Sequence, residues 1–225
     1  MRAALGIGIG RFNCLFHSHN RGKVVFEREA LHGLPWSTAL TDAAGRTEWR
    51  AAVFCWQGIA ALALFAVLLV LFFRRKRRDF REAAWEDGTV FRFFLLLYGA
   101  SEILLDSMRY DSGFLRSNGF VSLAQIFGGV SMLLVLILCS RRSVRALKLR
   151  PLHFAGWLLW LCGLGLAGYA EYYVQRHGNL YVFCYALMAL GLAAAVGVTV
   201  LFYRDTLQKT PVRVESEAAE KAGAA

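Results

Sequence analysis

The stretch AAVFCWQGIAALALFAVLLVLFF at residues 51–73, followed by RRKRRDFR at residues 74–81, decides the class of this protein. An apolar run of about 20 residues is long enough to cross a bilayer as a helix. A dense basic cluster directly after such a run is typical of the cytoplasmic end of the helix. Similar runs recur along the chain, so we predict an all-α, polytopic membrane helical bundle.

Three more stretches are clearly apolar over their whole length, and they are Gly119–Cys139, Leu152–Tyr173 and Leu180–Tyr203. Thr89–Leu105 is shorter and carries two charged residues, but its core is strongly apolar, and we expect it to be a fifth full span. Met1–Phe16 is short, has Arg11 inside it and is followed by no small-residue cleavage site, so it does not resemble a signal peptide. We expect it to be the partial, final part of a helix that begins before this chain does.

The composition argues against a soluble protein. Of the 225 residues, 57% are hydrophobic and 19% are charged, whereas soluble domains hold about 25% charged residues. A net charge of +10 would suggest nucleic-acid binding. The basic residues lie in loops between apolar spans, however, so we expect no nucleic acid among the partners. The five cysteines form no C-x-x-C pair and lie mostly in apolar runs, which indicates small buried hydrophobes.

The basic residues also predict the orientation. Clusters follow the first, third and fifth full spans, in 74–81, 141–150 and 204–221, whereas the loops 106–118 and 174–179 hold few basic residues. Because positive charge marks the cytoplasmic side of a membrane, we expect the C-terminus to be cytoplasmic and those two loops to be external.

The domain organisation that follows is simple. We expect one transmembrane domain over residues 1–205, with an external loop at 17–50, and a polar cytoplasmic tail at 206–225. Small residues are expected where helices pack closely, and they are the G-x-x-x-G pair of Gly6 and Gly10, then Gly163, Gly165 and Gly168, and Ala189, Ala193 and Gly197.

Polar residues, which are costly in a membrane, gather on one face of the predicted span Thr89–Leu105 and its continuation. Tyr98, Glu102, Asp106 and Arg109 recur at helical spacing. Asp106 and Arg109 are three positions apart and can form an ion pair. Glu102 lies a turn deeper, where a carboxylate needs a cation or a water-filled cavity, and Arg11 is the other candidate cation besides Arg109. A helix end that emerges into water with a solvated ion pair would also account for Arg109 and its neighbour Asp111.

Other polar residues have simpler interpretations. His17 and His19 are two positions apart, so they do not share a helix face, and no third ligand is evident; we expect no metal and no cofactor. Gln57 and Gln125 lie inside spans and are expected to join helices.

Three segments resemble the prolipoprotein diacylglyceryl transferase family. Gly10–Lys23 is similar to the family signature G-R-x-G-(N/C)-F-x-x-G-(E/C)-x-Y-G-(K/R) without a gap. Tyr98–Asp111 resembles a second signature that begins Y-G-x-x-R-F-x-x-E-x-x-R. Ser122–Gln125 resembles the short segment that opens the next family helix. The resemblance covers about residues 4–140. We expect residues 1–140 to form a family-like core, and the two spans in 152–203 to be additional.

The chain departs from the family pattern at functional positions. Asn13 replaces a glycine, and His19 stands where Glu or Cys is usual. Glu102 occupies the position of an arginine, and Asp106 replaces a glutamate. These changes leave the predicted site with less positive charge than the family pattern has, unless Arg21 or Lys23 folds into it.

The resemblance implies an enzyme of lipoprotein maturation in the bacterial inner or plasma membrane. Such enzymes transfer a diacylglyceryl group from phosphatidylglycerol to the lipobox cysteine thiol of prolipoproteins. The implied partners are therefore phosphatidylglycerol, prolipoprotein signal peptides and the lipid bilayer. The resemblance assigns catalytic roles to Arg11, Arg109, Asp106 and His19. It assigns substrate binding to Tyr98, Glu102, Gln125 and Gly22. Arg11 and Arg109 are expected to bind the phosphate, and His19 or Asp106 to act as base.

Two alternatives remain open at this stage. A catalytically inactive relative, acting as a lipid-binding or scaffold subunit, would explain the substitutions at residues 13, 19, 102 and 106. A small transporter or channel subunit would explain charge within a span, but it would need a polar stripe along a whole helix, and the charges lie at helix ends. Three further spans upstream with a His-Gly-Gly-Leu motif would favour the enzyme over the scaffold.

Overall fold

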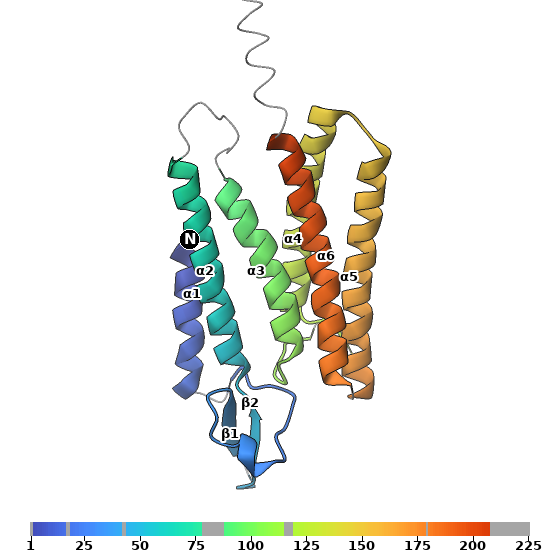
Figure 1. Cartoon of the computed structure of the whole chain (residues 1–225). Helices are drawn as coiled ribbons and strands as arrows, with labels where there is room; N and C mark the ends of the chain where they lie inside the picture. Colours follow the sequence, from blue (N-terminus) through green and yellow to red (C-terminus); the bar gives the residue numbers. More distant parts are fainter. Residues whose placement is uncertain are drawn as a thin grey trace, which may run out of the picture.

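The apolar runs of the sequence are helices in the computed structural model, which describes residues 2–16, 19–41, 44–77, 88–114, 119–178 and 180–207 (Figure 1). The fold is an all-α polytopic bundle. The helices of the described residues are α1 (Arg2–Phe12), α2 (Val53–Arg77), α3 (Thr89–Ser107), α4 (Leu123–Leu147), α5 (Pro151–His177) and α6 (Tyr181–Leu207). The predicted tail at 206–225 falls almost wholly outside the described residues.

Four of the described helices, α2, α4, α5 and α6, are long and apolar enough to cross a membrane. Helix α3 differs from them because Arg92, Glu102 and Asp106 lie within its nineteen residues. It nevertheless lies inside the bundle, in contact with α2, α4 and α6. Its charged residues are therefore shielded by neighbouring helices, while α1 packs on α2 and α5 packs on α6.

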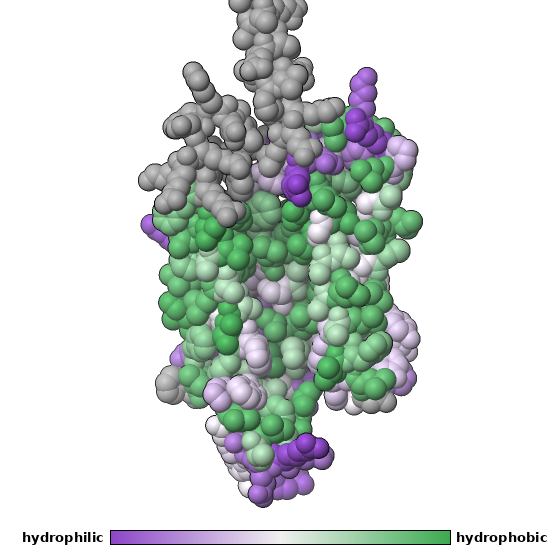
Figure 2. Space-filling view, in the orientation of Figure 1, coloured by the Kyte–Doolittle hydropathy of each residue, from purple (hydrophilic) through white to green (hydrophobic). Residues whose placement is uncertain are grey.

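The helices alternate in direction, as the loop charges predict. Figure 1 shows that α2, α4 and α6 all end at one end of the bundle, which is therefore the end rich in basic residues. The opposite end holds the last residues of α1, α3 and α5. Between the two ends the surface is mainly hydrophobic (Figure 2), with exposed side chains such as Phe127, Leu158 and Val182. A hydrophobic belt of this kind suits lipid contact.

The segment 17–50, expected to be a loop, contains a hairpin. Strand β1 (Ser37–Thr41) pairs antiparallel with β2 (Thr47–Ala51), with Ser37 opposite Ala51. The chain before β1 pairs with the other edge of β2, since the Phe26 N–H donates to the Trp49 carbonyl at 2.7 Å. The signal for this hairpin was the turn glycine Gly45, which adopts φ +77° between the two short strands.

Glycine allows two pairs of helices to approach closely. A Cβ on Gly163 of α5 would lie 2.5 Å from the Gly191 carbonyl of α6, and one on Gly99 of α3 would lie 2.7 Å from the Gly128 carbonyl of α4. The prediction at Gly163 is confirmed. The prediction is wrong for Gly6 and Gly10 and also for Gly165, Gly168 and Gly197, because a Cβ at any of these positions would meet nothing within 4 Å. Helix α1 instead turns Ala4 and Gly8, one turn apart, toward α2.

We predict that Gly163→Ala destabilises the bundle while Gly165→Ala does not. A Cβ at Gly163 must displace the backbone of α6, at a cost of about 1–3 kcal/mol. A Cβ at Gly165 would meet nothing within 4 Å, and alanine is the better helix former. Thermal unfolding of the two variants in detergent provides the test. Equal melting temperatures would show that the α5–α6 contact does not depend on glycine.

Candidate functional site

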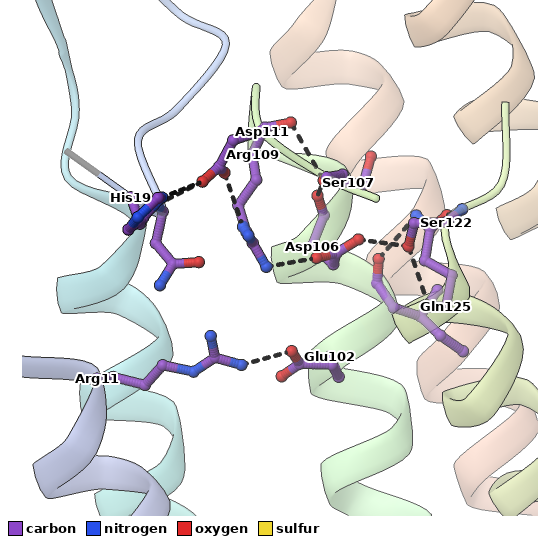
Figure 3. A network of polar contacts seen from close by, with 12 residues as sticks. Arg11, His19, Glu102, Asp106, Ser107, Arg109, Asp111, Ser122 and Gln125 are labelled. Carbon is purple, nitrogen blue, oxygen red and sulfur yellow. Dashed lines mark hydrogen bonds and ion pairs between the residues drawn. The ribbon is translucent and has the colours of Figure 1, made fainter. Parts of the chain in front are cut away.

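The predicted site residues gather where α1 and α3 end and α4 begins, at the end of the bundle that carries the hairpin (Figure 3). Two carboxylates of α3, Glu102 and Asp106, lie one helical turn apart on the same face. Both are buried, at 9% and 1% exposure. Buried charges are costly unless they are paired, so the surrounding cations determine whether this face is stable.

Arg11 pairs with the deeper carboxylate. It lies in the last turn of α1, and its Nη2 is 2.7 Å from Glu102 Oε1. Tyr98, one turn before Glu102, interacts with both Arg11 and Glu102. Of the two candidate cations, Arg11 pairs with Glu102, while Arg109 pairs with Asp106. The pair joins α1 to α3, two helices that contact each other little elsewhere.

Arg109 pairs with the shallower carboxylate. Its Nη1 is 2.9 Å from Asp106 Oδ1, and its Nε is 3.1 Å from Asp111 Oδ1. The second oxygen of Asp106 accepts a hydrogen bond from the Ser122 hydroxyl. Both oxygens of Asp106 are thus engaged, and the Asp106–Arg109 ion pair predicted from their spacing is present.

Backbone hydrogen bonds join the two segments that resembled family signatures. Gly22 and Arg109 form an antiparallel bridge, the Lys23 N–H donates to the Met108 carbonyl at 2.9 Å, and the Tyr110 N–H donates to the Arg21 carbonyl at 2.9 Å. The Asn20 N–H donates to Asp111 Oδ2 at 2.9 Å, across 91 positions of sequence. The tertiary structure therefore brings the two segments together edge to edge.

The Asp111 carboxylate is fastened to both segments. Burial alone disfavours its charged form, but the Asn20 N–H and the Arg109 guanidinium outweigh that effect and hold the pKa of Asp111 below its ordinary value. His19 lies beside it at the rim, with Nδ1 3.9 Å from Asp111 Oδ2 and a side chain that is 76% exposed. His19 therefore belongs to the Arg109 side of the site rather than to the Arg11–Glu102 pair.

Gly22 occupies a position that requires glycine for packing. A Cβ there would lie 2.7 Å from the Ala51 Cβ at the end of β2. The Gly22 N–H also donates to the Ala51 carbonyl at 2.7 Å. Gly22 thus lets the segment after α1 lie against the hairpin while it pairs with Arg109.

Gln125 holds the beginning of α4 against α3. Ser122 is the N-cap of α4, and Ser122 and Gln125 form a reciprocal capping box. The Gln125 amide also donates to the Ile103 carbonyl of α3 at 3.3 Å. Its expected role in joining helices is confirmed. For Gln57, the other glutamine, the structure gives no hydrogen-bond partner of the side chain among the described residues.

Two further cations fold into the site. Arg21 is 5% exposed, and its guanidinium lies 4.9 Å from the centre of the Phe54 ring. Burial lowers the pKa of Arg21. Lys23 Nζ donates to the Ser107 carbonyl at the end of α3, at 2.7 Å. Asp111 favours the charged form of Arg21, and Asp106 favours that of Lys23, so both cations lie among the charges of the site but neither contacts Glu102 in the described residues.

Several residues of the site were not among the predicted site residues. Asn20 and Ser122 hold the carboxylates of Asp111 and Asp106, and Asn20 adopts φ +59°, a conformation that asparagine tolerates. For Asn20, the sequence signal was the presence of an asparagine in a polar loop. Ser122 was noted only in the segment that resembles the opening of a family helix, which did not indicate its contact with Asp106.

Comparison with known proteins supports the resemblance. Residues 1–141 match the family described as prolipoprotein diacylglyceryl transferase. Two curated proteins named phosphatidylglycerol–prolipoprotein diacylglyceryl transferase, from Tropheryma whipplei strains Twist and TW08/27, are each 28% identical over 122 residues. The match covers 52% of this chain and 42% of each relative, so the chain spans less than half of their length. No solved structure gives a significant match.

We predict that Asp111→Asn lowers the melting temperature at neutral pH and that the difference from the unchanged protein shrinks in acid. The Asp111 carboxylate has a lowered pKa, so its contribution is complete above the ordinary aspartate pKa of about 4 and is lost as the pH falls through the lowered value. Thermal unfolding between pH 3 and 7 tests this, with the exposed Glu27→Gln as control. A difference that does not vary with pH would contradict it.

Proposed function

Because the chain belongs to the prolipoprotein diacylglyceryl transferase family, we propose that it transfers a diacylglyceryl group from phosphatidylglycerol to the lipobox cysteine thiol of prolipoproteins. It is a multi-pass bacterial membrane protein of this transferase type. The observation that carries the proposal is that Arg11 and Arg109, from separate elements, reach adjacent turns of one face of α3. Two guanidinium groups in this arrangement suit a lipid phosphate.

The carboxylates orient the arginines without using all of their donors. A guanidinium has five N–H donors. Arg11 gives one to Glu102, and Arg109 gives one to Asp106 and one to Asp111. In this proposal the oxygens of a phosphate diester accept from the other N–H groups, except the one with which Arg11 contacts Tyr98. In this proposal Tyr98 and Glu102 hold Arg11 beside the lipid headgroup, while Gln125 and Gly22 maintain the shape of the substrate-binding region.

The proposed reaction needs a deprotonated thiol and a stabilised leaving group. The thiol gives up its proton, its sulfur forms a bond to the glyceryl carbon, and the bond from that carbon to the phosphate oxygen breaks. Glycerol phosphate leaves with the electron pair of that bond, and the arginines stabilise its charge. Of the two candidate bases, His19 is favoured, because both oxygens of Asp106 already accept hydrogen bonds while the His19 ring is exposed.

The proposal includes an orientation in the bacterial cell membrane. The basic ends of α2, α4 and α6 lie on one side, which we assign to the cytoplasm together with the C-terminus. The site and the hairpin then face outward, where a signal peptide that has crossed the membrane presents its cysteine. Phosphatidylglycerol and the signal peptide would both reach the site laterally through the bilayer.

We predict that Arg11→Ala and Arg109→Ala each reduce transfer roughly 100- to 1,000-fold, because each removes a cation from the departing phosphate. The measurement is transfer of labelled diacylglyceryl from phosphatidylglycerol to a lipobox peptide in proteoliposomes. Arg28→Ala, which changes an exposed arginine of the external segment, is the control. Lipid binding without transfer by the unchanged chain would instead indicate a non-catalytic lipid-binding subunit.

For the orientation, we predict that a cysteine at Thr47 reacts with a membrane-impermeant maleimide in intact spheroplasts, whereas one at Lys148 reacts only after lysis. Thr47 begins β2 at the hairpin end, and Lys148 follows α4 at the basic end. The five native cysteines are free, so the unchanged chain provides the background. The reverse labelling pattern would place the site on the cytoplasmic side and contradict the proposal.

A further inference from the structure

Strand β1 turns backbone hydrogen-bonding groups away from its partner strand. The Ala52 N–H donates to the Trp36 carbonyl at 2.8 Å, just before β1 begins. Hydrogen-bonded pairs alternate along an antiparallel ladder, so the next such pair is Thr38 with Arg50. The backbone N–H and C=O of Ala39 therefore point to the outer edge of β1. Within the described residues, these two groups bond to no other backbone group.

Strand β1 is the open edge of a layer that begins at the candidate site. The segment 108–110, which contains Arg109, pairs with the segment 21–26. The segment 21–26 also pairs with β2, since the Ala51 N–H donates to the Val24 carbonyl at 3.2 Å, and β2 pairs with β1. Both β2 and 21–26 thus have a neighbour on each side, whereas in the described part of the chain β1 has β2 as its one neighbour.

The sequence of β1 does not protect this edge. Proteins usually blunt an open edge with a charged side chain, a proline or a bulge. Strand β1 reads STALT, without charge or proline, and its five residues pair in register without a bulge. Ala39 and Thr41 are exposed, and the hairpin projects beyond the ends of α1 and α2 (Figure 1). An extended chain can therefore approach the edge.

We propose that the outer edge of β1 binds an extended segment of the acceptor polypeptide as an additional strand. The inference rests on the proposed function for the identity of that polypeptide. Addition of a strand takes its affinity from main-chain hydrogen bonds. It therefore suits an enzyme that accepts prolipoproteins of different sequence.

The geometry of the layer indicates which part of the acceptor pairs. Neighbouring strands lie about 4.8 Å apart, so an added strand lies four such steps, or about 19 Å, from the segment that contains Arg109. An extended chain advances about 3.3 Å per residue, so about six residues separate a cysteine at the site from the paired segment. The signal peptide before the cysteine occupies the bilayer. The paired segment is therefore the external part that follows the cysteine.

The first experiment leaves the protein unchanged and alters the main chain of the acceptor. A dye-labelled lipobox peptide with about twelve residues after the cysteine, long enough to reach β1, is N-methylated at one amide at a time. Its Kd for the full chain in detergent is measured by fluorescence anisotropy. Only alternate amides of a strand face its neighbour. We therefore expect roughly ten-fold weaker binding at every second amide from about the sixth residue onward, and little change at the amides between. Equal weakening at successive amides, or weakening at none, would overturn the proposal.

The second experiment removes the outward N–H of β1. Ala39→Pro deletes this donor but spares the β1–β2 ladder, because the Ala39 N–H points away from β2. Ala39→Val is the matched control, since valine keeps the N–H and suits a strand. We expect Ala39→Pro to weaken binding of the long peptide roughly ten-fold and Ala39→Val to leave it unchanged. A peptide that ends directly after the cysteine cannot reach β1 and should bind both variants equally.

Loss of affinity for both peptides in Ala39→Pro, or for neither, would contradict strand addition. If Ala39→Pro does not accumulate in membranes, the N-methylated series decides. A second copy of the chain is the competing occupant of the edge. A dimer that Ala39→Pro dissociates, together with a Kd that shows no alternation, would assign the edge to that copy and overturn the proposal.

The same peptides separate this inference from the proposed function. No transfer by the unchanged chain, with a Kd that alternates along the peptide, would reject the proposed function and leave strand addition standing. Transfer to the long peptide without alternation would reject strand addition alone. Where both hold, Ala39→Pro should raise the KM for the long peptide with little change in kcat, because the lost contact lies far from the reacting atoms.

Discussion

Two ion pairs on one face of α3 are the constraint on which the rest of the site depends. Glu102 and Asp106 are buried in a bundle that is otherwise apolar, and each is paired with an arginine from elsewhere in the chain or from the end of its own helix. Removing one partner would leave a buried charge uncompensated. The positions of α1 and of the segment around residue 109 therefore follow from the need to neutralise α3.

The hairpin is an extension of this site rather than a separate feature. The segment after α1 bonds to Arg109 and Met108 on one side and to β2 on the other, through Gly22 and Ala51. The polar end of the bundle is thus one hydrogen-bonded layer, continuous from α3 to β1. A close backbone approach at Gly22 makes that layer possible, which gives a packing reason for a residue first noticed as part of a motif.

Much of the architecture could be predicted because hydropathy and charge are local properties. The length of the apolar runs predicted the spans, and the loop charges predicted their alternation. Helical spacing was enough to predict the Asp106–Arg109 pair. The Arg11–Glu102 pair followed from the cost of an unpaired carboxylate at residue 102. The prediction for Gly6 and Gly10 was wrong because spacing identifies a helix face but not which face turns to a neighbour. The hairpin was missed because turn-type residues of its segment, among them Gly33, Pro35 and Gly45, were interpreted as a loop throughout.

The sequence alone determined that this is a membrane bundle, which end of it is basic and which residue types converge at the other end. Tertiary structure decided the particular partners, such as Ser122 on Asp106, Asn20 on Asp111 and Lys23 on the Ser107 carbonyl. The physical reason is that these contacts depend on how helices distant in sequence are rotated and packed. Hydrophobicity brings the helices together, but close packing sets the distances of a few ångströms at which polar atoms interact.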